Sequence, residues 1–272
     1  MDEYYGYRTI SMKDNELSDF YANLYDVSFL KINEYGLIEN NGEIIDTICY
    51  QGDTLRHVRW PIIKGRREDL HPRNIYQSLA IDLLLDTKSK VKLLRGVYGS
   101  GKDLLMTTAA LSLIDKGKFQ KIVFIRPNVT VANVPDIGYL PGDADEKLAW
   151  TLGPIMDKVG GEAQLKTLLN NNAIENMPLL YVRGRSFDNS IIYVTEGQNM
   201  TSDVVKLLIS RVGEGSELWI NGDSRQVDKK IFNEDNGLSL MVDRLAGNPL
   251  FGYVWLPITE RGDVANLANL LD

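Results

Sequence analysis

The chain from residue 74 onward alternates between two hydrophobic patterns. Residues 75–85, 102–116 and 202–210 place apolar side chains about every 3.6 positions, which predicts helices. Short continuous apolar runs of the kind that form buried strands lie between and after them: VKLLR at 91–95, KIVFIR at 121–126, SIIYVTE at 190–196, ELWING at 217–222 and YVWLP at 253–257. Strands that alternate with helices predict a parallel sheet covered on both faces, with a further helix at the C-terminus.

The first 65 residues follow a different pattern. Short runs rich in aromatic and β-branched residues predict strands: YGYRTI at 5–10, VSFLKI at 27–32, YGLIEN at 35–40, EIIDTICY at 43–50 and LRHVRW at 55–60. Asn40, Asn41 and Gly42 predict a tight hairpin, because Asn and Gly accept positive φ. We therefore expect a small antiparallel β subdomain over 1–65, a connector over 66–73 and an α/β domain over 74–272.

The composition is that of a globular protein, with 272 residues, 44% hydrophobic and 25% charged. No run approaches the roughly 18 apolar residues that span a bilayer, and the N-terminus lacks the basic start of a signal peptide, so we expect no membrane association and a cytoplasmic location. The single Cys49 excludes an internal disulfide and is expected to be buried, and two histidines leave little for a zinc site.

The net charge of −7 is unevenly distributed. Residues 1–55 hold eleven acids and three bases, for a net charge of −8, whereas residues 56–95 hold ten bases and four acids, for +6. The basic stretch HVRWPIIKGRRED at 57–69 is equally consistent with a phosphate-binding surface and with a solvated linker.

One motif carries chemistry. Gly96, four residues, Gly101 and Lys102 have the spacing of a phosphate-binding P-loop, and they follow a predicted strand and open a predicted helix. In such a loop backbone N–H groups surround the β-phosphate and the lysine reaches the β- and γ-oxygens. The next residue is Asp103, where that chemistry uses a Ser or Thr hydroxyl. Thr195-Glu196 ends another predicted strand, where an Asp-Glu pair is usual, so the two metal-side groups look exchanged.

Beyond this loop, the chain from Pro72 to Asp272 resembles the PhoH-like P-loop ATPases, which are related to superfamily 1 helicases. Ten blocks carry the resemblance in order: PRNIYQ, GVYGSGKD, FIRPNV, IGYLPGDADEK, LLYVRGRSFDN, IIYVTEGQN, ISRVGEGSE, INGDSRQVD, NGLSLMVDRL and ITERGDVANLANLL. The resemblance implies a helicase-like P-loop NTPase fold. The N-terminal region is similar to the β segment before the ATPase half of PIN-PhoH fusions. We expect the PIN nuclease to be absent and a bacteriophage origin in a bacterial host.

The resemblance also implies roles for individual residues. Gln77 matches the glutamine that reads adenine, and an amide suits that edge because it both donates and accepts. Glu196 matches the carboxylate that orients the attacking water. The phosphate loop is matched by Gly96, Gly99, Ser100, Gly101 and Lys102. Asp223 and Gln226 match the motif that senses the γ-phosphate.

The resemblance assigns arginines as well. Arg211 and Arg261 match arginines near the nucleotide, and Arg261 is expected to reach a neighbouring subunit as an arginine finger. Arg126, Arg183 and Arg185 lie in matching blocks, where nucleotide contact, RNA contact and structural pairing are all open. An arginine finger in trans implies a homo-oligomeric ring such as a hexamer, and the helicase relationship implies coupling to single-stranded RNA or DNA.

The departures from the family pattern lie mainly at the positions expected to face the magnesium ion. The family has Thr or Ser at position 103 and Asp at position 195, and a minor difference is Gly262 in place of Ser. One hypothesis is a compensated exchange, in which an ATPase that binds Mg²⁺ and ATP keeps one carboxylate and one hydroxyl at the metal. The metal side then consists of Asp103, Glu196 and, through water, Thr195. Turnover of ATP is expected to be slower. The rival hypothesis is decay to a nucleotide-binding or structural, host-interaction ring. An unbridged carboxylate about 4 Å from a phosphate costs about 4 kcal/mol at an effective dielectric near 20.

Overall fold

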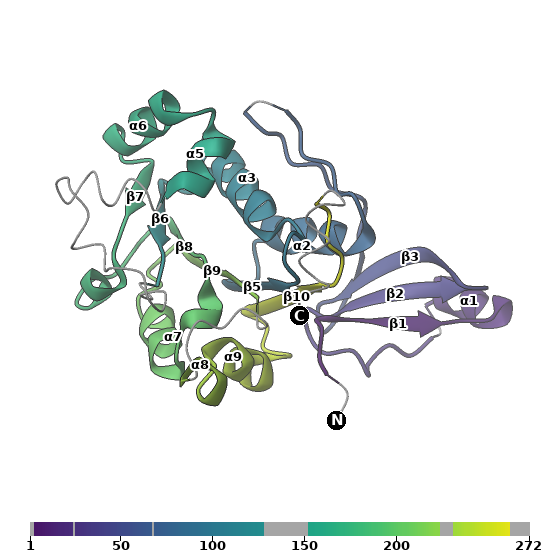
Figure 1. Ribbon diagram of the computed structural model, residues 1–272. Coiled ribbons are helices and arrows are strands. Elements are labelled where there is room, and N and C mark those ends of the chain that lie inside the picture. The colour runs from purple at the N-terminus through teal and green to yellow at the C-terminus, as the bar shows by residue number, and fades with distance from the viewer. Residues whose placement is uncertain (1–2, 24, 67, 128–151, 224–230, 262–272) are drawn as a thin grey trace.

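The main body of the protein is a six-stranded sheet covered by helices (Figure 1). The computed structural model describes residues 3–23, 25–66, 68–127, 152–223 and 231–261. The strands are β5 (Val91–Gly96), β6 (Lys121–Ile125), β7 (Ile174–Asn176), β8 (Ser190–Val194), β9 (Glu217–Gly222) and β10 (Phe251–Leu256). They are ordered β10-β5-β9-β8-β6-β7, and every neighbouring pair is parallel. The predicted parallel α/β sheet is confirmed.

Helices cover both faces of this sheet. On one face lie α2 (Ile75–Leu85), α3 (Lys102–Asp115), α5 (Gly153–Val159) and α6 (Glu162–Asn170), and on the other lie α7 (Ser202–Ile209), α8 (Ile231–Glu234) and α9 (Gly237–Leu245) (Figure 1). Two short 3₁₀ turns, η3 (Leu179–Val182) and η4 (Gly197–Asn199), follow β7 and β8. The two faces bury separate apolar clusters, one around Leu79, Met106 and Ile191 and the other around Leu208, Ile220 and Leu238. Within the described residues no helix has the length and apolarity needed to cross a bilayer.

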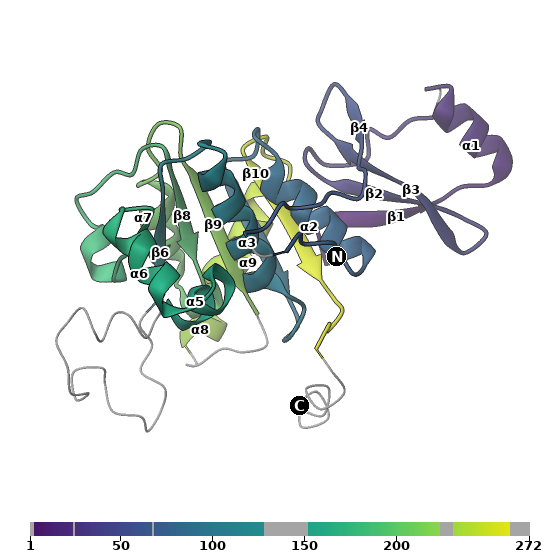
Figure 2. The same ribbon diagram turned by 90° about the horizontal axis from the view of Figure 1, so that it is seen from above.

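The N-terminal residues form a second, smaller sheet beside α2 and β10 (Figure 2). Its elements are β1 (Tyr7–Ser11), α1 (Asp14–Tyr21), β2 (Tyr35–Asn40), β3 (Glu43–Tyr50) and β4 (Leu55–His57). Strands β2, β3 and β4 pair antiparallel as expected, whereas β1 joins β2 in parallel. The hairpin is confirmed at its tip, where Asn41 and Gly42 have φ values of 52° and 85°.

Two expectations for the N-terminal region are wrong. Residues 27–32 form turns rather than a strand, because the Asp26 carboxylate accepts the Ser28 N–H at 2.8 Å and Leu30 donates to the Val27 carbonyl. Val27 and Leu30, three residues apart, are buried there. The helix α1 was not predicted, since its eight residues bury only Phe20 and carry little apolar periodicity.

The small sheet and the main body share buried contacts. Tyr35, Leu37 and Cys49 belong to the same apolar cluster as α2. The carboxylate of Asp82 on α2 accepts hydrogen bonds from the Tyr35 hydroxyl at 2.9 Å and from both terminal nitrogens of Arg56 at 2.6 Å. The sheet is therefore fixed against the helix whose first turn reaches the P-loop.

Candidate nucleotide site

The expected site residues follow three neighbouring strands. In the order β5-β9-β8 the strands are adjacent and parallel, so their carboxyl ends lie at one edge of the sheet. The loop 96–101 follows β5, Asp223 follows β9, and Thr195-Glu196 follows β8. Ligands of open α/β sheets bind at this edge.

The loop between β5 and α3 has the backbone of a phosphate cradle. Gly99 and Gly101 adopt φ values of 73° and 91°, a region that L side chains rarely enter. A Cβ at Gly96 would lie 2.6 Å from the Leu256 backbone oxygen. The Lys102 ammonium donates to the Gly96 and Val97 carbonyls at 2.8 and 2.9 Å, which folds it over the loop that it would leave to meet a phosphate.

Lys102 is also the centre of the local charge. Burial lowers the pKa of its ammonium, and the carboxylates of Asp223, Asp103 and Glu196 oppose that shift. These three acids, each predicted from the sequence to lie at the nucleotide site, thus all act on the same lysine. An anionic ligand at this position would contact both the Lys102 ammonium and a cation held by the carboxylates.

Asp103 and Thr195 lie in direct contact. The Thr195 hydroxyl lies 3.0 Å from Asp103 Oδ1, and the same oxygen accepts hydrogen bonds from the Tyr193 hydroxyl at 3.0 Å and from Asn221 Nδ2 at 2.8 Å. Burial raises the pKa of Tyr193 well above its usual range, and the Asp103 charge raises it further, so the phenol stays a donor. Three neutral donors therefore fix one oxygen of a carboxylate at the start of α3.

Glu196 is held by its backbone and by a neighbour. Its φ of 56° is left-handed, an uncommon conformation for a non-glycine residue that occurs often at functional sites. Gln198 Nε2 donates to the Glu196 carboxylate at 2.7 Å, and Gln198 Oε1 accepts the Asp223 N–H at 3.1 Å. Gln198 is 2% exposed, so one buried amide joins the ends of β8 and β9.

Gln77 lies beneath the P-loop. Its Nε2 donates to the Ser100 carbonyl at 3.0 Å and its Oε1 accepts the Arg73 N–H at 2.9 Å. Asn74 caps α2 by accepting the Gln77 N–H at 2.9 Å. The structure therefore gives Gln77 a role in holding the loop, while the reading of adenine stays a prediction.

Arg261 lies on its own P-loop. Its guanidinium hydrogen-bonds the Tyr98 hydroxyl and lies 4.5 Å from the centroid of that ring. The Thr259 hydroxyl donates to the Tyr98 carbonyl at 2.8 Å, and the Glu260 N–H donates to the Gly99 carbonyl at 3.0 Å. The Arg261 guanidinium therefore lies beside the P-loop of its own chain, and its role as an arginine finger toward a neighbouring subunit stays a prediction.

Other predicted residues are not brought to this edge. Arg211 donates to the Arg185 carbonyl, and its own carbonyl accepts the Phe187 N–H. Because residues 187 and 211 precede the first residues of β8 and β9, Arg211 lies at the amino edge of the sheet, opposite the P-loop. Gln226, the block 137–147 and the predicted C-terminal helix lie outside the described residues.

The remaining arginines divide by position. Arg185 pairs with Glu175 at 2.7 Å and lies over the Phe187 ring, which is structural pairing. Arg126 directly follows β6, and its guanidinium lies 3.9 Å from the Glu196 carboxylate, at the carboxyl edge of the sheet. In the basic stretch, Lys64 pairs with Asp69 and Arg66 with Asp115, which reduces the charge available to phosphates.

The donor set suits magnesium held jointly with a nucleotide. Mg²⁺ prefers hard oxygen ligands and keeps several waters. Asp103 Oδ2 accepts no hydrogen bond from any described residue, so it is available as a carboxylate ligand, with the Thr195 hydroxyl beside it. Within the described part of the chain no group of three acidic, histidine or cysteine side chains could hold a metal ion by itself.

Sequence reasoning missed Tyr193 and Asn221. Tyr193 lies two residues before Thr195 on β8, so the alternation of a strand places both side chains on one face. Asn221 lies two residues before Asp223 at the end of β9. This spacing could have identified both as neighbours of Asp103.

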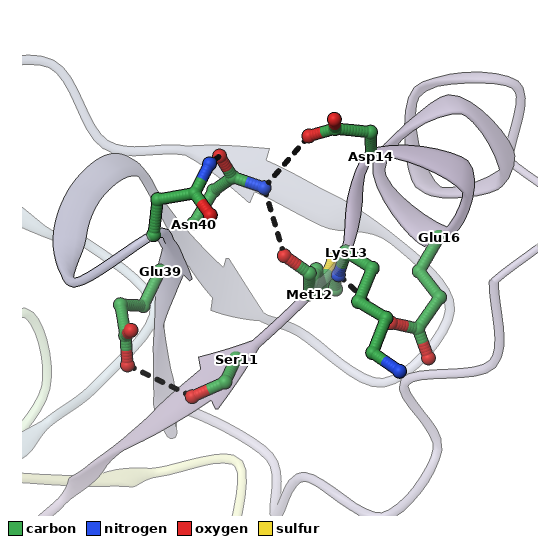
Figure 3. A pocket seen from close by; sticks show the side chains of 8 residues that line it. Ser11, Met12, Lys13, Asp14, Glu16, Glu39 and Asn40 are labelled. Atoms are coloured by element: carbon green, nitrogen blue, oxygen red, sulfur yellow. Dashed lines mark hydrogen bonds between the residues drawn. The ribbon is translucent and has the colours of Figure 1, made fainter.

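A pocket of about 530 Å³ lies away from this edge, where β1 meets α1 and the β2–β3 hairpin (Figure 3). Its polar groups bond to one another: Ser11 donates to Glu39 at 2.8 Å, and Asn40 donates to Asp14 at 3.1 Å. These contacts hold β1 and α1 to β2, and no side chain lining the pocket is among those with a buried polar atom that lacks a partner within the described residues.

The fold and the edge cluster together define the class of protein. A parallel α/β sheet, a glycine loop that leads into a helix and acids at the ends of adjacent strands are the parts of a P-loop nucleoside triphosphatase. Comparison with protein families gives the particular group: the model of the PhoH-like protein family matches residues 69–260. The chain belongs to that family.

Individual relatives agree with this assignment. The chain is 33% identical over 279 residues to Protein PhoH2 of Bacillus subtilis, which covers 97% of this chain and 60% of that protein. It is 33% identical over 214 residues to Protein PhoH2 of Mycolicibacterium smegmatis, covering 76% of this chain and 49% of that protein. The chain thus spans about half to three fifths of the length of these relatives.

A solved structure shows a weaker likeness. The Pif1 helicase from Candida albicans aligns with 74% of this chain and 44% of its own, at 14% identity and a TM-score of 0.39. At that TM-score the likeness adds nothing to what the sheet order and the family match establish.

Proposed function

We propose that this protein is a magnesium-dependent ATPase in which a carboxylate and a hydroxyl have exchanged places at the metal. The observation that carries the proposal is the 3.0 Å contact between Thr195 Oγ1 and Asp103 Oδ1 beside Lys102. The site keeps one carboxylate and one hydroxyl, but their positions are exchanged. The carboxylate, Asp103, lies on α3, and the hydroxyl, Thr195, follows β8. A hard cation accepts either kind of oxygen.

The remaining parts of the site have distinct tasks. Lys102 leaves the loop carbonyls to contact the β- and γ-phosphates, and the Glu196 carboxylate accepts a hydrogen bond from the attacking water. Arg261 adds positive charge near the transferred group from its position on Tyr98. Magnesium, when bound with ATP at Asp103, neutralises charge on the phosphate oxygens.

The finer expectations from the sequence are part of the same proposal. They are the reading of adenine by Gln77, coupling to single-stranded RNA or DNA, a homo-oligomeric ring and a cytoplasmic location. Arg211, at the amino edge of the sheet, can meet a nucleotide only in a neighbouring copy. The rival to this proposal is a degenerate site that binds nucleotide without turnover, or a ring that serves only to bind partners.

A double-mutant cycle tests the exchange. Asp103→Thr and Thr195→Asp are each expected to lower kcat/KM for ATP by about tenfold or more, because each single change leaves two hydroxyls or two carboxylates at the metal. The double change is expected to restore at least the wild-type value. Lys102→Ala serves as the inactive reference in each background.

Independent, additive effects of the two changes contradict the exchange. A wild type without magnesium-dependent phosphate release, together with an active double variant, favours the degenerate site instead.

A further inference from the structure

The carboxylate of Asp103 is fixed in place by uncharged groups. Oδ1 accepts the hydrogen bonds of Tyr193, Thr195 and Asn221, and Asn221 is 1% exposed. The Asn221 amide also lies 3.3 Å from the Tyr193 hydroxyl and its oxygen lies 3.2 Å from the Thr195 hydroxyl, so the holders are joined to one another. The carboxylate therefore cannot swing away from an arriving phosphate without breaking a buried network.

Among the described residues, this carboxylate has no salt-bridge partner. Within the described residues no lysine or arginine forms a salt bridge with Asp103, and the Lys102 ammonium is directed to the Gly96 and Val97 carbonyls. Glu196 and Asp223 add further negative charge around the same lysine. A P-loop with a hydroxyl at this position presents no such charge to the nucleotide.

We infer that Asp103 makes the site selective for the metal–nucleotide complex and excludes the metal-free nucleotide. The inference rests on the proposed nucleotide site and goes beyond it by assigning the ligand that the site accepts. A fixed carboxylate repels bare phosphate oxygens, and a divalent cation between the two converts the repulsion into coordination. Because the cation would bridge Asp103 and the phosphate oxygens, metal and nucleotide should each strengthen the binding of the other, which is reciprocal coupling between two ligands.

Equilibrium binding tests the selectivity directly. A fluorescent, non-hydrolysable ATP analogue is titrated into the full chain in excess Mg²⁺ and again in EDTA. The wild type is expected to bind at least about 100-fold more weakly in EDTA, because like charges near 4 Å repel strongly inside a protein.

Asp103→Asn keeps the shape and the Oδ1 acceptor but removes the charge. It is expected to bind the analogue in EDTA about tenfold or more tightly than the wild type does, with a smaller gain on adding Mg²⁺. Asp103→Ser, which restores the hydroxyl, is expected to change in the same direction. A purely structural role for Asp103 predicts weaker binding in both buffers.

Asp115→Asn is the matched control. It makes the same chemical change at the other end of α3, where the exposed Asp115 pairs with Arg66, and it is expected to leave both affinities unchanged.

Two results overturn the inference, and they are distinguishable. The selectivity is rejected if the wild-type affinities in Mg²⁺ and in EDTA lie within about threefold of each other. It is also rejected if neither Asp103 variant binds the analogue more tightly than the wild type in EDTA. Both results leave the proposed nucleotide site standing. Failure of the folded wild type to bind the analogue in either buffer rejects the proposed function as well.

Discussion

Gln198 is the side chain through which two functional strand ends contact each other. Its amide donates to Glu196 and accepts from the Asp223 backbone, so one buried side chain joins the carboxylate predicted to orient water and the turn predicted to sense the γ-phosphate. A Cβ at Gly222 would lie 2.9 Å from the Gln198 backbone nitrogen and 2.9 Å from the Gln198 Oε1. The glycine therefore leaves the space that this contact needs. We interpret Gln198 as a positioning residue for Glu196.

Replacing Gln198 tests that interpretation. Gln198→Ala is expected to lower kcat about 10- to 100-fold, because a displacement of about 1 Å at the attacking group costs that much, while the Kd for the magnesium–ATP complex changes less than about threefold. Steady-state kinetics and equilibrium binding measure the two quantities separately. Gln120→Ala, at an exposed glutamine before β6, is the control and is expected to match the wild type. Equal losses in kcat and affinity would indicate a collapsed site instead of a misplaced carboxylate.

Individual site residues were predictable where spacing determines geometry. The P-loop glycines follow from their motif, and the contact between Asp103 and Thr195 agrees with the sequence-based idea that they form a pair. The second bonds of Gln77 and Gln198 were not predictable, since an amide reaches partners on other elements that only the tertiary packing determines. The position of Arg261 on Tyr98 likewise depends on how the chain returns after β10.

At the scale of elements, Asp82 connects α2 to the small N-terminal sheet. Its carboxylate receives Arg56 and Tyr35, directly beside Cys49 in the same buried cluster. Burial raises the pKa of the Cys49 thiol to about 12. The only cysteine of the chain is therefore a probe of whether the sheet stays on the helix.

Thiol labelling at pH 8 measures that contact. Native Cys49 is expected to react far more slowly than a free thiol, since a pKa of about 12 leaves about one thiolate in ten thousand at pH 8. Asp82→Ala is expected to raise the labelling rate about tenfold or more, because Arg56 and Tyr35 lose their buried acceptor. Asp46→Ala removes a carboxylate on β3 whose partners Tyr21 and His57 are exposed, so it is the matched control and should have little effect. A comparable rise in both variants would show that Cys49 does not report on the α2 contact.

The hydrophobic pattern predicted some elements of the main body and missed others. The helices α2, α3 and α7 and the strands β5, β6, β8, β9 and β10 lie where the hydrophobic pattern predicts them. The helices α1, α5, α6, α8 and α9 and the strand β7 were not predicted from the hydrophobic pattern. Lys92 illustrates a further limit: it lies within an apolar strand at 1% exposure because Glu217, 125 positions later, pairs with it at 2.7 Å.

At the scale of the whole molecule, residues predicted to contact the nucleotide lie at both edges of the main sheet. The P-loop, Asp103, Glu196 and Arg261 gather at the carboxyl edge, whereas Arg211 lies at the amino edge. Arg261 lies beside the P-loop of its own chain, and the ring expected from the sequence stays a prediction. The parallel sheet was predictable from local patterns, but the division of the arginines between its edges depends on topology.

The most direct test of the account is the release of phosphate from ATP as magnesium is titrated. We expect the wild type to release phosphate only when magnesium is present. Glu196→Gln is expected to lower the rate about 100-fold or more while the variant still binds magnesium–ATP, because the amide is a much poorer acceptor for the attacking water. Glu214→Gln, at an exposed glutamate on the amino edge, is expected to match the wild type. A wild-type rate no higher than that of Glu196→Gln at every magnesium concentration would contradict the claim that the exchanged site hydrolyses ATP.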